Sequence, residues 1–312
     1  LIETCEESGS YDLPPYLDAL GDQIGTPDLI VVLDSGGPTY EHIWVTEALR
    51  GLVAGRLSVR VSTEGVHSGM IGGTIPSSFR IQRILLDRIE DSSTGEVLIP
   101  EMHVPIPDIV KQQAAGLGAI LGDALWASLP VVETLQPQTE GADQMLLDIN
   151  WRPALAVIGA DGLPPVQTAG NVLRTNTDLK LSFRIPPGVE AETVQNRVKE
   201  ILEADPPYGA QVTYEAEPPS NGFRAPAMDE RVAAALDEAA MQLTDSPPMT
   251  TWIGGTIPFM AMIQQKYPGA SFLCTGSSGP GNNAHGPDEK LHIPHSKRVN
   301  VVLAAAVAAL CE

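Results

Sequence analysis

Two acidic residues stand side by side near the start of the chain, at Glu6 and Glu7. They follow segment 1–5, Leu-Ile-Glu-Thr-Cys, which is typical of the inside of a strand, and they precede the turn-like Ser8-Gly9-Ser10. Adjacent acids usually form a solvated loop. At a strand end they can instead take two roles in hydrolysis: one carboxylate binds a metal ion, and its neighbour acts as general base toward the metal-bound water.

Two further candidate ligands also follow apolar runs. Asp34 comes directly after segment 29–33, and His285 lies in a glycine-rich stretch after segment 270–275. A lone aspartate at a strand end is commonly a turn cap, and His285 is as readily a surface histidine as a ligand. Carboxylate and imidazole groups are nevertheless the ligands that zinc takes in hydrolases. One of the two adjacent glutamates, Asp34 and His285 are therefore candidate metal ligands, and none of these signals is strong when taken singly.

Other residues suit the binding of an anionic group. Arg184 lies inside an apolar strand, where a guanidinium needs a carboxylate partner or a ligand. The loop around Gly255 and Thr256 offers backbone amides, close approach and a hydroxyl to an anionic terminus. His67 follows a half-buried strand and, taken alone, is an ordinary turn histidine.

The elements that must hold these residues are of two kinds. The continuous apolar run 29–33 predicts a parallel strand buried on both faces. After residue 223 the α/β pattern returns, with a helix at 231–241, a short apolar strand at 270–275 and a buried terminal helix at 299–310. Because ligands of open α/β sheets lie at the carboxyl ends of strands, Asp34 is expected at such an edge.

The middle of the chain has another pattern. Period-two alternation predicts strands at 57–61, at 179–185 and from 212, and helical spacing predicts helices at 79–89 and 194–202. This order is that of a ferredoxin-like α+β sandwich with an antiparallel sheet. Segment 91–150, with a helix starting near Asp108, is too long for a plain loop and is interpreted as an elaboration of this domain. The boundaries that we predict are 1–55, 56–222 and 223–312, an α/β domain interrupted by an insertion.

Composition excludes some classes of partner. The 312 residues carry a net charge of −20, which repels phosphate backbones and anionic membrane surfaces, so neither nucleic acid nor membrane is expected as a partner. Three cysteines are too few for a disulfide framework and fit a reducing, cytoplasmic setting. No apolar run approaches the length that spans a bilayer.

The order of the motifs resembles the aminoacylase/carboxypeptidase/dipeptidase family of dinuclear zinc metallopeptidases, nearest to its carnosinase-like, cytosolic non-specific dipeptidase branch. The motifs that carry the resemblance are Glu6-Glu7-Ser8-Gly9-Ser10, Asp34, His67-Ser68-Gly69, Ser182-Phe183-Arg184, Gly254-Gly255-Thr256-Ile257-Pro258 and Asn283-Ala284-His285. The resemblance implies a mixed-sheet, zinc-peptidase-like catalytic domain, incomplete at its N-terminus and interrupted by a ferredoxin-like α+β lid and dimerisation domain.

The resemblance also implies a role for each acidic residue. Glu6 matches the general base that acts on a metal-bridging water. Glu7 and His285 match ligands of one metal ion, and Asp34 matches a ligand of the other. The intact protein would thus hold two divalent ions, zinc or manganese, in each subunit.

The remaining residues match substrate contacts in the family. His67 matches a histidine that reaches into the partner subunit's site and polarises the scissile carbonyl, so a homodimer through the inserted domain is implied. Arg184 matches the residue that grips the substrate carboxylate. Asn171 matches a polar contact to substrate, and Thr256 with Gly255 lies in the loop near the C-terminal carboxylate.

One departure from the family concerns the metal ions. The family's bridging aspartate and a further histidine ligand lie upstream of the Glu-Glu motif, and this chain begins five residues before Glu6. We therefore expect a truncated chain that binds the metal ions weakly or not at all, and we expect the activity of the intact protein rather than of this fragment. The expected activity is hydrolysis of dipeptides or short peptides. The alternatives are an N-acyl-amino-acid deacylase or desuccinylase with the same residues, and a non-catalytic dimeric binding module.

Overall fold

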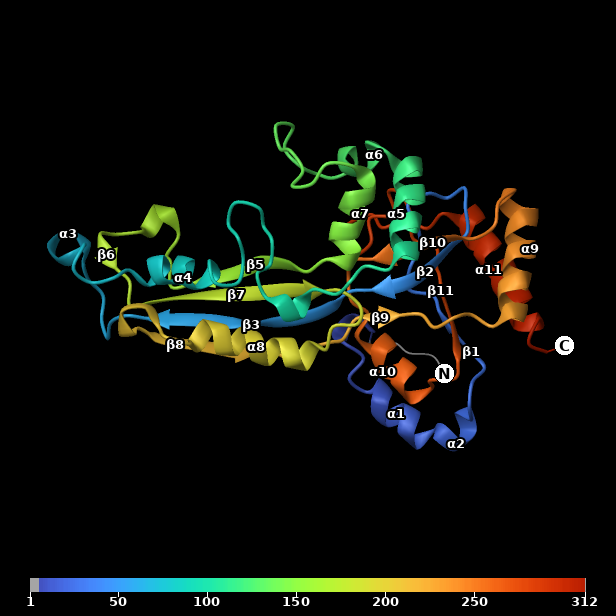
Figure 1. Cartoon of the computed structure of the whole chain (residues 1–312), viewed down its shortest axis with the longest axis horizontal. Coiled ribbons are helices and arrows are strands. Elements are labelled where there is room, and N and C mark those ends of the chain that lie inside the picture. The colour runs from blue at the N-terminus through green and yellow to red at the C-terminus, as the bar shows by residue number, and fades with distance from the viewer. Residues whose placement is uncertain (1–5, 312) are drawn as a thin grey trace. The chain divides into compact units, whose positions relative to one another are not determined.

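The computed structural model describes residues 6–311, in which the chain forms two compact units (Figure 1). Unit 1 contains the residues up to Leu49, segment 119–121 and the residues from Phe223 onward. Unit 2 contains segments 50–118 and 122–222. The strand expected at 1–5 lies outside the described residues.

Unit 1 is built on parallel strand pairs whose members come from opposite ends of the sequence. β1 (Leu29–Val32) pairs with β11 (Ser271–Cys274) in parallel, and β2 (Trp44–Leu49) pairs in parallel with β10 (Met249–Ile253). β9 (Phe223–Arg224) joins the other edge of β2 in the antiparallel sense. The predicted parallel pairing of segment 29–33 is thus confirmed, and the strands of this unit are mixed in direction.

The helices of unit 1 enclose two apolar clusters. They are α1 (Leu13–Ala19), α2 (Gly21–Ile24), α9 (Glu230–Thr244), α10 (Pro258–Lys266) and α11 (Ile293–Ala308). Phe272 of β11 packs in a cluster with residues of α1 and α10, whereas the next residue, Leu273, packs in a cluster with residues of α9 and α11. Strand β11 is therefore buried from both sides, as its apolar sequence requires.

Two expectations for unit 1 were wrong in detail. Strand β1 is not buried on both faces, because Val31 is 37% exposed, and Leu33, which directly follows the strand, is 58% exposed. The terminal helix α11 begins at Ile293 rather than at residue 299, since Pro294 suits the first turn and the His292 ring accepts a hydrogen bond from the amide of His295. It is also only partly buried, because Val301 and Val307 face outward.

Unit 2 contains a four-stranded antiparallel sheet in the order β5-β7-β3-β8. Its strands are β3 (Gly51–Arg60), β5 (Ala154–Asp161), β7 (Asn176–Ile185) and β8 (Gln211–Ala216). Helices α4 (Ser78–Leu86) and α8 (Ala191–Glu203) cover one face (Figure 1). The predicted ferredoxin-like arrangement is confirmed. Helix α4 ends three residues before Ile89, because 3-10-type backbone bonds such as Ile89 N to Leu86 O close the last turn.

Segment 91–150, which belongs to unit 2 except for residues 119–121, contains helices, one of which was expected. They are α5 (Asp108–Leu121), α6 (Ala124–Ala127) and α7 (Ala142–Trp151). Shorter elements of this unit are β4 (Val66–His67), α3 (Ser68–Ile71) and β6 (Val172–Leu173). Single 3-10 turns are η1 (Glu6–Ser8), η2 (Pro100–Met102), η3 (Val166–Thr168) and η4 (Pro207–Gly209). Among the helices of residues 6–311, none is long and apolar enough to cross a membrane.

Candidate metal centre and substrate groups

The loops that follow β1 and β11 are joined through their backbones. Beyond the strand pair, the amide of Thr275 donates to Val32 O at 3.0 Å, and the amide of Ser278 donates to Ser35 O at 3.3 Å. The amide of Gly37 then donates to Ser278 O at 3.1 Å. Asp34 is therefore held at the carboxyl end of β1, beside the loop that leads toward His285.

Glu7 and His285 meet in unit 1 although 278 residues separate them. Nε2 of His285 lies 2.9 Å from Oε1 of Glu7. Asp34 lies close enough to interact electrostatically with both groups. Its partial burial raises the pKa of Asp34, and the negative charge of Glu7 raises this pKa further. The interaction with His285 lowers it and so opposes the shift. Three of the residues predicted as metal ligands are therefore gathered on one side of unit 1.

The loop around His285 has an unusual backbone. Asn283, His285 and Asp288 all adopt positive φ angles, of 56°, 60° and 58°. Side chains other than glycine enter this region at a cost of about 1–3 kcal/mol each when the surroundings impose it. The bond from the amide of Gly286 to Asn283 O, and the bond from the Asn283 side chain to Pro287 O, hold the loop in this form.

Glu6 and Glu7 lie in the short turn η1, where Gly9 N donates to Glu6 O at 2.8 Å. Glu6 is partly buried and Glu7 is exposed, so the turn directs the two carboxylates into different surroundings. Within residues 6–311, no three His, Cys, Asp or Glu side chains converge tightly enough to form a complete metal site. The assignment of Glu7, Asp34 and His285 as ligands stays a prediction, and its chemistry fits: a divalent cation would relieve the repulsion between the two carboxylates and accept an imidazole.

The loop between β10 and α10 carries the other predicted group of unit 1. Gly255 and Thr256 are both partly buried there, and a Cβ added at Gly255 would meet only the side chain of Ile253, at 3.5 Å. The backbone of Gly255 is thus open to close approach. An anion at this loop would meet backbone amides and the hydroxyl of Thr256.

In unit 2, the structure brings His67 and Asn171 together. His67 of β4 pairs with Val172 of β6, and the amide of Ser68 donates to Asn171 O at 2.9 Å. The His67 ring is exposed, and its Nδ1 accepts the amide of Gly69 at 3.1 Å. This bond fixes the ring, so Nε2 is the nitrogen left for another group.

Arg184 lies on the central strand β7, opposite Leu52 of β3 and Ala154 of β5. Burial lowers the pKa of Arg184. Arg50 stands close by: burial, reinforced by the charge of Arg184, lowers the pKa of Arg50 to about 10. Arg50 was not among the residues predicted from the sequence, although a cation between the apolar residues Leu49 and Leu52 is the same signal as Arg184 inside its apolar strand.

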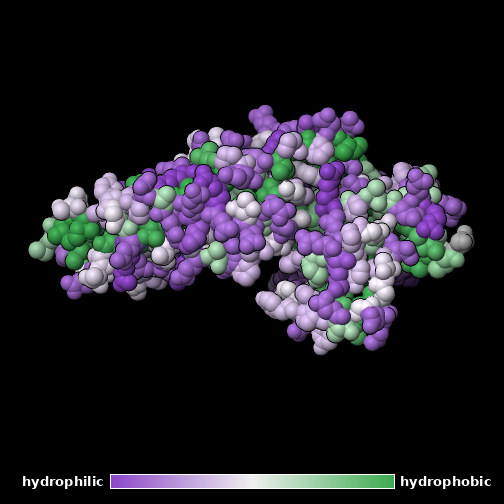
Figure 2. Space-filling view, turned by 60° about the horizontal axis from the view of Figure 1, so that its bottom comes forward, coloured by the Kyte–Doolittle hydropathy of each residue, from purple (hydrophilic) through white to green (hydrophobic). Residues whose placement is uncertain are grey.

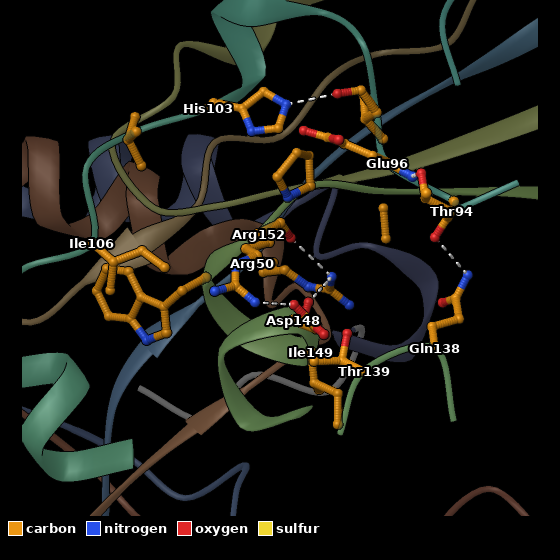
Figure 3. A pocket seen from close by; sticks show the side chains of 16 residues that line it. Arg50, Thr94, Glu96, His103, Ile106, Gln138, Thr139, Asp148, Ile149 and Arg152 are labelled. Atoms are coloured by element: carbon orange, nitrogen blue, oxygen red, sulfur yellow. Dashed lines mark hydrogen bonds and ion pairs between the residues drawn. The ribbon is translucent and has the colours of Figure 1, made fainter. Parts of the chain in front are cut away.

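A cavity of about 580 Å³ in unit 2 is lined by Arg50 and by residues from segments 94–106 and 138–154 (Figure 3). The polar groups that line this cavity form hydrogen bonds and an ion pair with one another. Arg152 is paired with Asp148, the His103 ring lies 2.7 Å from Val97 O, and Arg50 Nη1 lies 3.4 Å from the carbonyl oxygens of both Asp148 and Arg152. None of the site residues predicted from the sequence lines this cavity, and we assign it no role.

Comparison with known proteins places the chain in a family. Its sequence matches peptidase family M20/M25/M40 over residues 1–309. The chain belongs to this family. A cysteinylglycine-S-conjugate dipeptidase of Corynebacterium striatum is 28% identical over 309 residues, which are 93% of this chain and 62% of that protein. A Cys-Gly metallodipeptidase of Schizosaccharomyces pombe is 24% identical over 208 residues, which are 64% of this chain and 42% of that protein.

The fold of this M20/M25/M40 member is also found in solved structures. The dipeptidase Dug1p of Saccharomyces cerevisiae superimposes with a TM-score of 0.78 at 21% identity, over 98% of this chain and 64% of that one. The chain thus spans less than two thirds of the length of each of these relatives. The likeness confirms the mixed α/β fold class expected from the sequence.

Proposed function

We propose that this chain forms a large part of a metal-dependent peptidase that hydrolyses dipeptides. The observation that carries the proposal is the meeting of Glu7 with His285 at 2.9 Å, beside Asp34, at the carboxyl ends of parallel strands in unit 1. Membership of the M20/M25/M40 peptidase family supports it, and so do relatives that are named dipeptidases.

We propose two divalent ions, zinc or manganese, as the cofactors. Glu7 and His285 would hold one ion and Asp34 would contribute to the other. Bound ions would supply charge stabilisation for the developing oxyanion and a lowered pKa for a water molecule. Burial is the main cause that raises the pKa of Asp34, and repulsion from Glu7 adds to it. That repulsion supports the assignment, because a cation would remove it.

Proton transfer and substrate binding would be carried out by side chains of the protein itself. Glu6 would take the proton from the attacking water and pass it to the leaving amine. Arg184 would bind the substrate carboxylate as a planar, two-pronged donor. In unit 1, Thr256 and the amide of Gly255 would offer hydrogen bonds to an anionic substrate group. Asn171 would add a polar contact to the substrate.

His67 would polarise the scissile carbonyl in the site of a second subunit. Its surroundings support a protein contact there: Met70 and Val166 are 82% and 88% exposed, and Val172 is exposed beside them. Figure 2 shows apolar surface gathered over this end of unit 2, around α3 and β6. We therefore propose a homodimer through unit 2, with unit 2 as the lid and dimerisation domain and unit 1 as the catalytic part.

Metal analysis combined with substrate assays tests the proposal. Purified chain loaded with Mn²⁺ or Zn²⁺ is expected to hydrolyse cysteinylglycine and other unblocked dipeptides faster than N-acetyl or N-succinyl amino acids. The reverse order would identify a deacylase or desuccinylase. Absence of both metal uptake and turnover would identify a non-catalytic binding module.

A further inference from the structure

Three small polar side chains are buried directly beneath Asp34. Thr46 of β2, which is 1% exposed, donates from its hydroxyl to Ser35 Oγ at 3.0 Å. The thiol of Cys274, at the end of β11, donates to the same Ser35 oxygen at 3.7 Å. Strand β2 and the end of strand β11 are thereby both bonded to Ser35, the residue next to Asp34.

Strand β2 also holds the second loop of the candidate metal centre. Thr275, which directly follows β11, donates from its hydroxyl to Trp44 O at 2.7 Å. Hydroxyl groups therefore attach the loop after β1 and the loop after β11 to the same strand, through Thr46 in one case and Trp44 in the other. Strand β2 sets the spacing of both loops.

Asp34 lies between an exposed and a buried residue. Leu33, the residue before it, is 58% exposed, whereas Ser35 is buried and 6% exposed. The backbone of the loop bonds to the segment around Ser278, and the indole of Trp44 donates to Thr39 O at 2.8 Å. The buried side chain of Ser35 attaches the loop that carries Asp34 to β2 and β11.

We propose that the hydrogen bond between Thr46 and Ser35 is a positioning pair, which places the Asp34 carboxylate for metal binding together with Glu7 and His285. The inference rests on the proposed function, because Asp34 is taken there as a metal ligand. Neither Ser35 nor Thr46 touches the substrate. Groups that hydrogen-bond to a metal ligand typically change metal affinity about 10–100-fold when they are lost. The Thr46–Ser35 pair acts one residue away, through the backbone that joins Ser35 to Asp34, so we expect an effect at the lower end of that range.

The test compares Thr46→Val, which keeps the shape of the side chain and removes the donor, with Thr46→Ser, which keeps the hydroxyl. The matched control is Thr177→Val in unit 2, where a fully buried threonine shares a 2.8 Å hydroxyl bond with Ser78. Two readouts are used: Co²⁺ affinity from its d–d absorption, and amide hydrogen exchange at Gly37 and Ser278 in metal-free protein.

Thr46→Val is expected to weaken Co²⁺ binding about tenfold or more, while Thr46→Ser restores it and Thr177→Val leaves it unchanged. Exchange at Gly37 and Ser278 should rise in Thr46→Val alone. Wild-type Co²⁺ affinity in Thr46→Val would overturn the positioning role. If the wild-type chain binds no Co²⁺, the proposed function fails by itself, and the exchange measurement decides: unchanged exchange in Thr46→Val then overturns the positioning role as well.

Discussion

The contact between Glu7 and His285 is too exposed to be explained by stability. Their side chains keep 71% and 75% of their exposure, and surface pairs of this kind typically contribute about 0–1 kcal/mol. The positive φ of His285 alone costs about 1–3 kcal/mol. The pair with Glu7 therefore does not by itself account for the conformation of the loop, which is consistent with the proposed role of His285 as a metal ligand.

The carboxylate proposed as general base gives a direct test at this scale. Glu6→Gln keeps the size and polarity of the side chain but removes its ability to accept a proton. Turnover of a dipeptide is expected to fall about 10²–10⁴-fold, the range usual for loss of general base catalysis. Metal content, measured by elemental analysis, should not change. Glu41→Gln, at an exposed site in the same unit, is the control, and retained turnover in Glu6→Gln would refute the assignment.

A buried histidine makes unit 1 sensitive to acid. His295 is 1% exposed and packs against the Tyr40 ring at 5.4 Å; burial, with further contributions from the charges of Arg298 and His292, lowers the pKa of His295. The unfolded chain then binds this proton more tightly than the folded one. The stability contribution is complete above the ordinary histidine value of about 6.5 and is lost as the pH falls through the lowered pKa.

His295→Gln should therefore reduce the loss of unfolding free energy between neutral pH and pH 5. Urea titrations of wild type and variant at several pH values measure this difference. Parallel pH dependence in the two proteins would contradict the prediction.

At the scale of elements, close backbone approach fixes the two loops of the candidate centre. A Cβ at Gly276 would lie 1.9 Å from Ser35 O, and one at Gly36 would lie 1.9 Å from Ser278 O. Both contacts are with backbone, which cannot swing aside as a long side chain does. Glycine is thus required at both positions by space alone.

Substitution at one of these glycines separates this effect from ordinary propensity. Gly276→Ala is expected to lower the free energy of unfolding by about 1–3 kcal/mol or more, as overpacking does. Gly269→Ala, where an added Cβ meets nothing within 4 Å, should change it by no more than about 0.5 kcal/mol. Equal effects of the two substitutions in chemical denaturation would disprove the close-approach argument.

Some elements could be predicted from the sequence and others could not, for physical reasons. Apolar and polar residues alternate in β3 and β7, which is typical of a half-buried sheet, so the ferredoxin-like order was predicted. The Ala/Val-rich helix α11 has little contrast between its faces, and its outward residues were therefore missed. The bond between Ser35 and Thr46 could not be predicted, because small hydroxyl residues are ordinary in strands and their partner depends on how the strands are laid side by side.

At the scale of the whole molecule, the predicted site residues are divided between the two units. Glu6, Glu7, Asp34, Gly255, Thr256 and His285 belong to unit 1, and His67, Asn171 and Arg184 belong to unit 2. The grouping of Glu7, Asp34 and His285 was predicted from a resemblance, since pairing across most of the chain has no local signal. Arg50 was overlooked because no matching family motif pointed to it.

Mixing two inactive variants tests the proposed exchange of histidines between subunits. Glu6→Gln and His67→Gln should each be inactive alone. In a random mixture, half of the dimers combine the two, and each such dimer has one site with both groups intact, so activity should recover to roughly a quarter of wild type. Dissociation and reassociation followed by a dipeptide assay measures the recovery, and no recovery would place His67 in the site of its own subunit.

The pairing of β1 with β11 and of β2 with β10 has a consequence for how the protein is made. Unit 1 is interrupted by the whole of unit 2, so apolar residues such as Ile30, Val32 and Trp44 leave the ribosome long before their partner strands exist. At translation rates of about 5–20 residues per second, the roughly 220 intervening residues take about 11–44 s to synthesise. Throughout that interval the first strands of unit 1 are candidates for chaperone binding or misassociation, while unit 2 can complete its own sheet on the nascent chain.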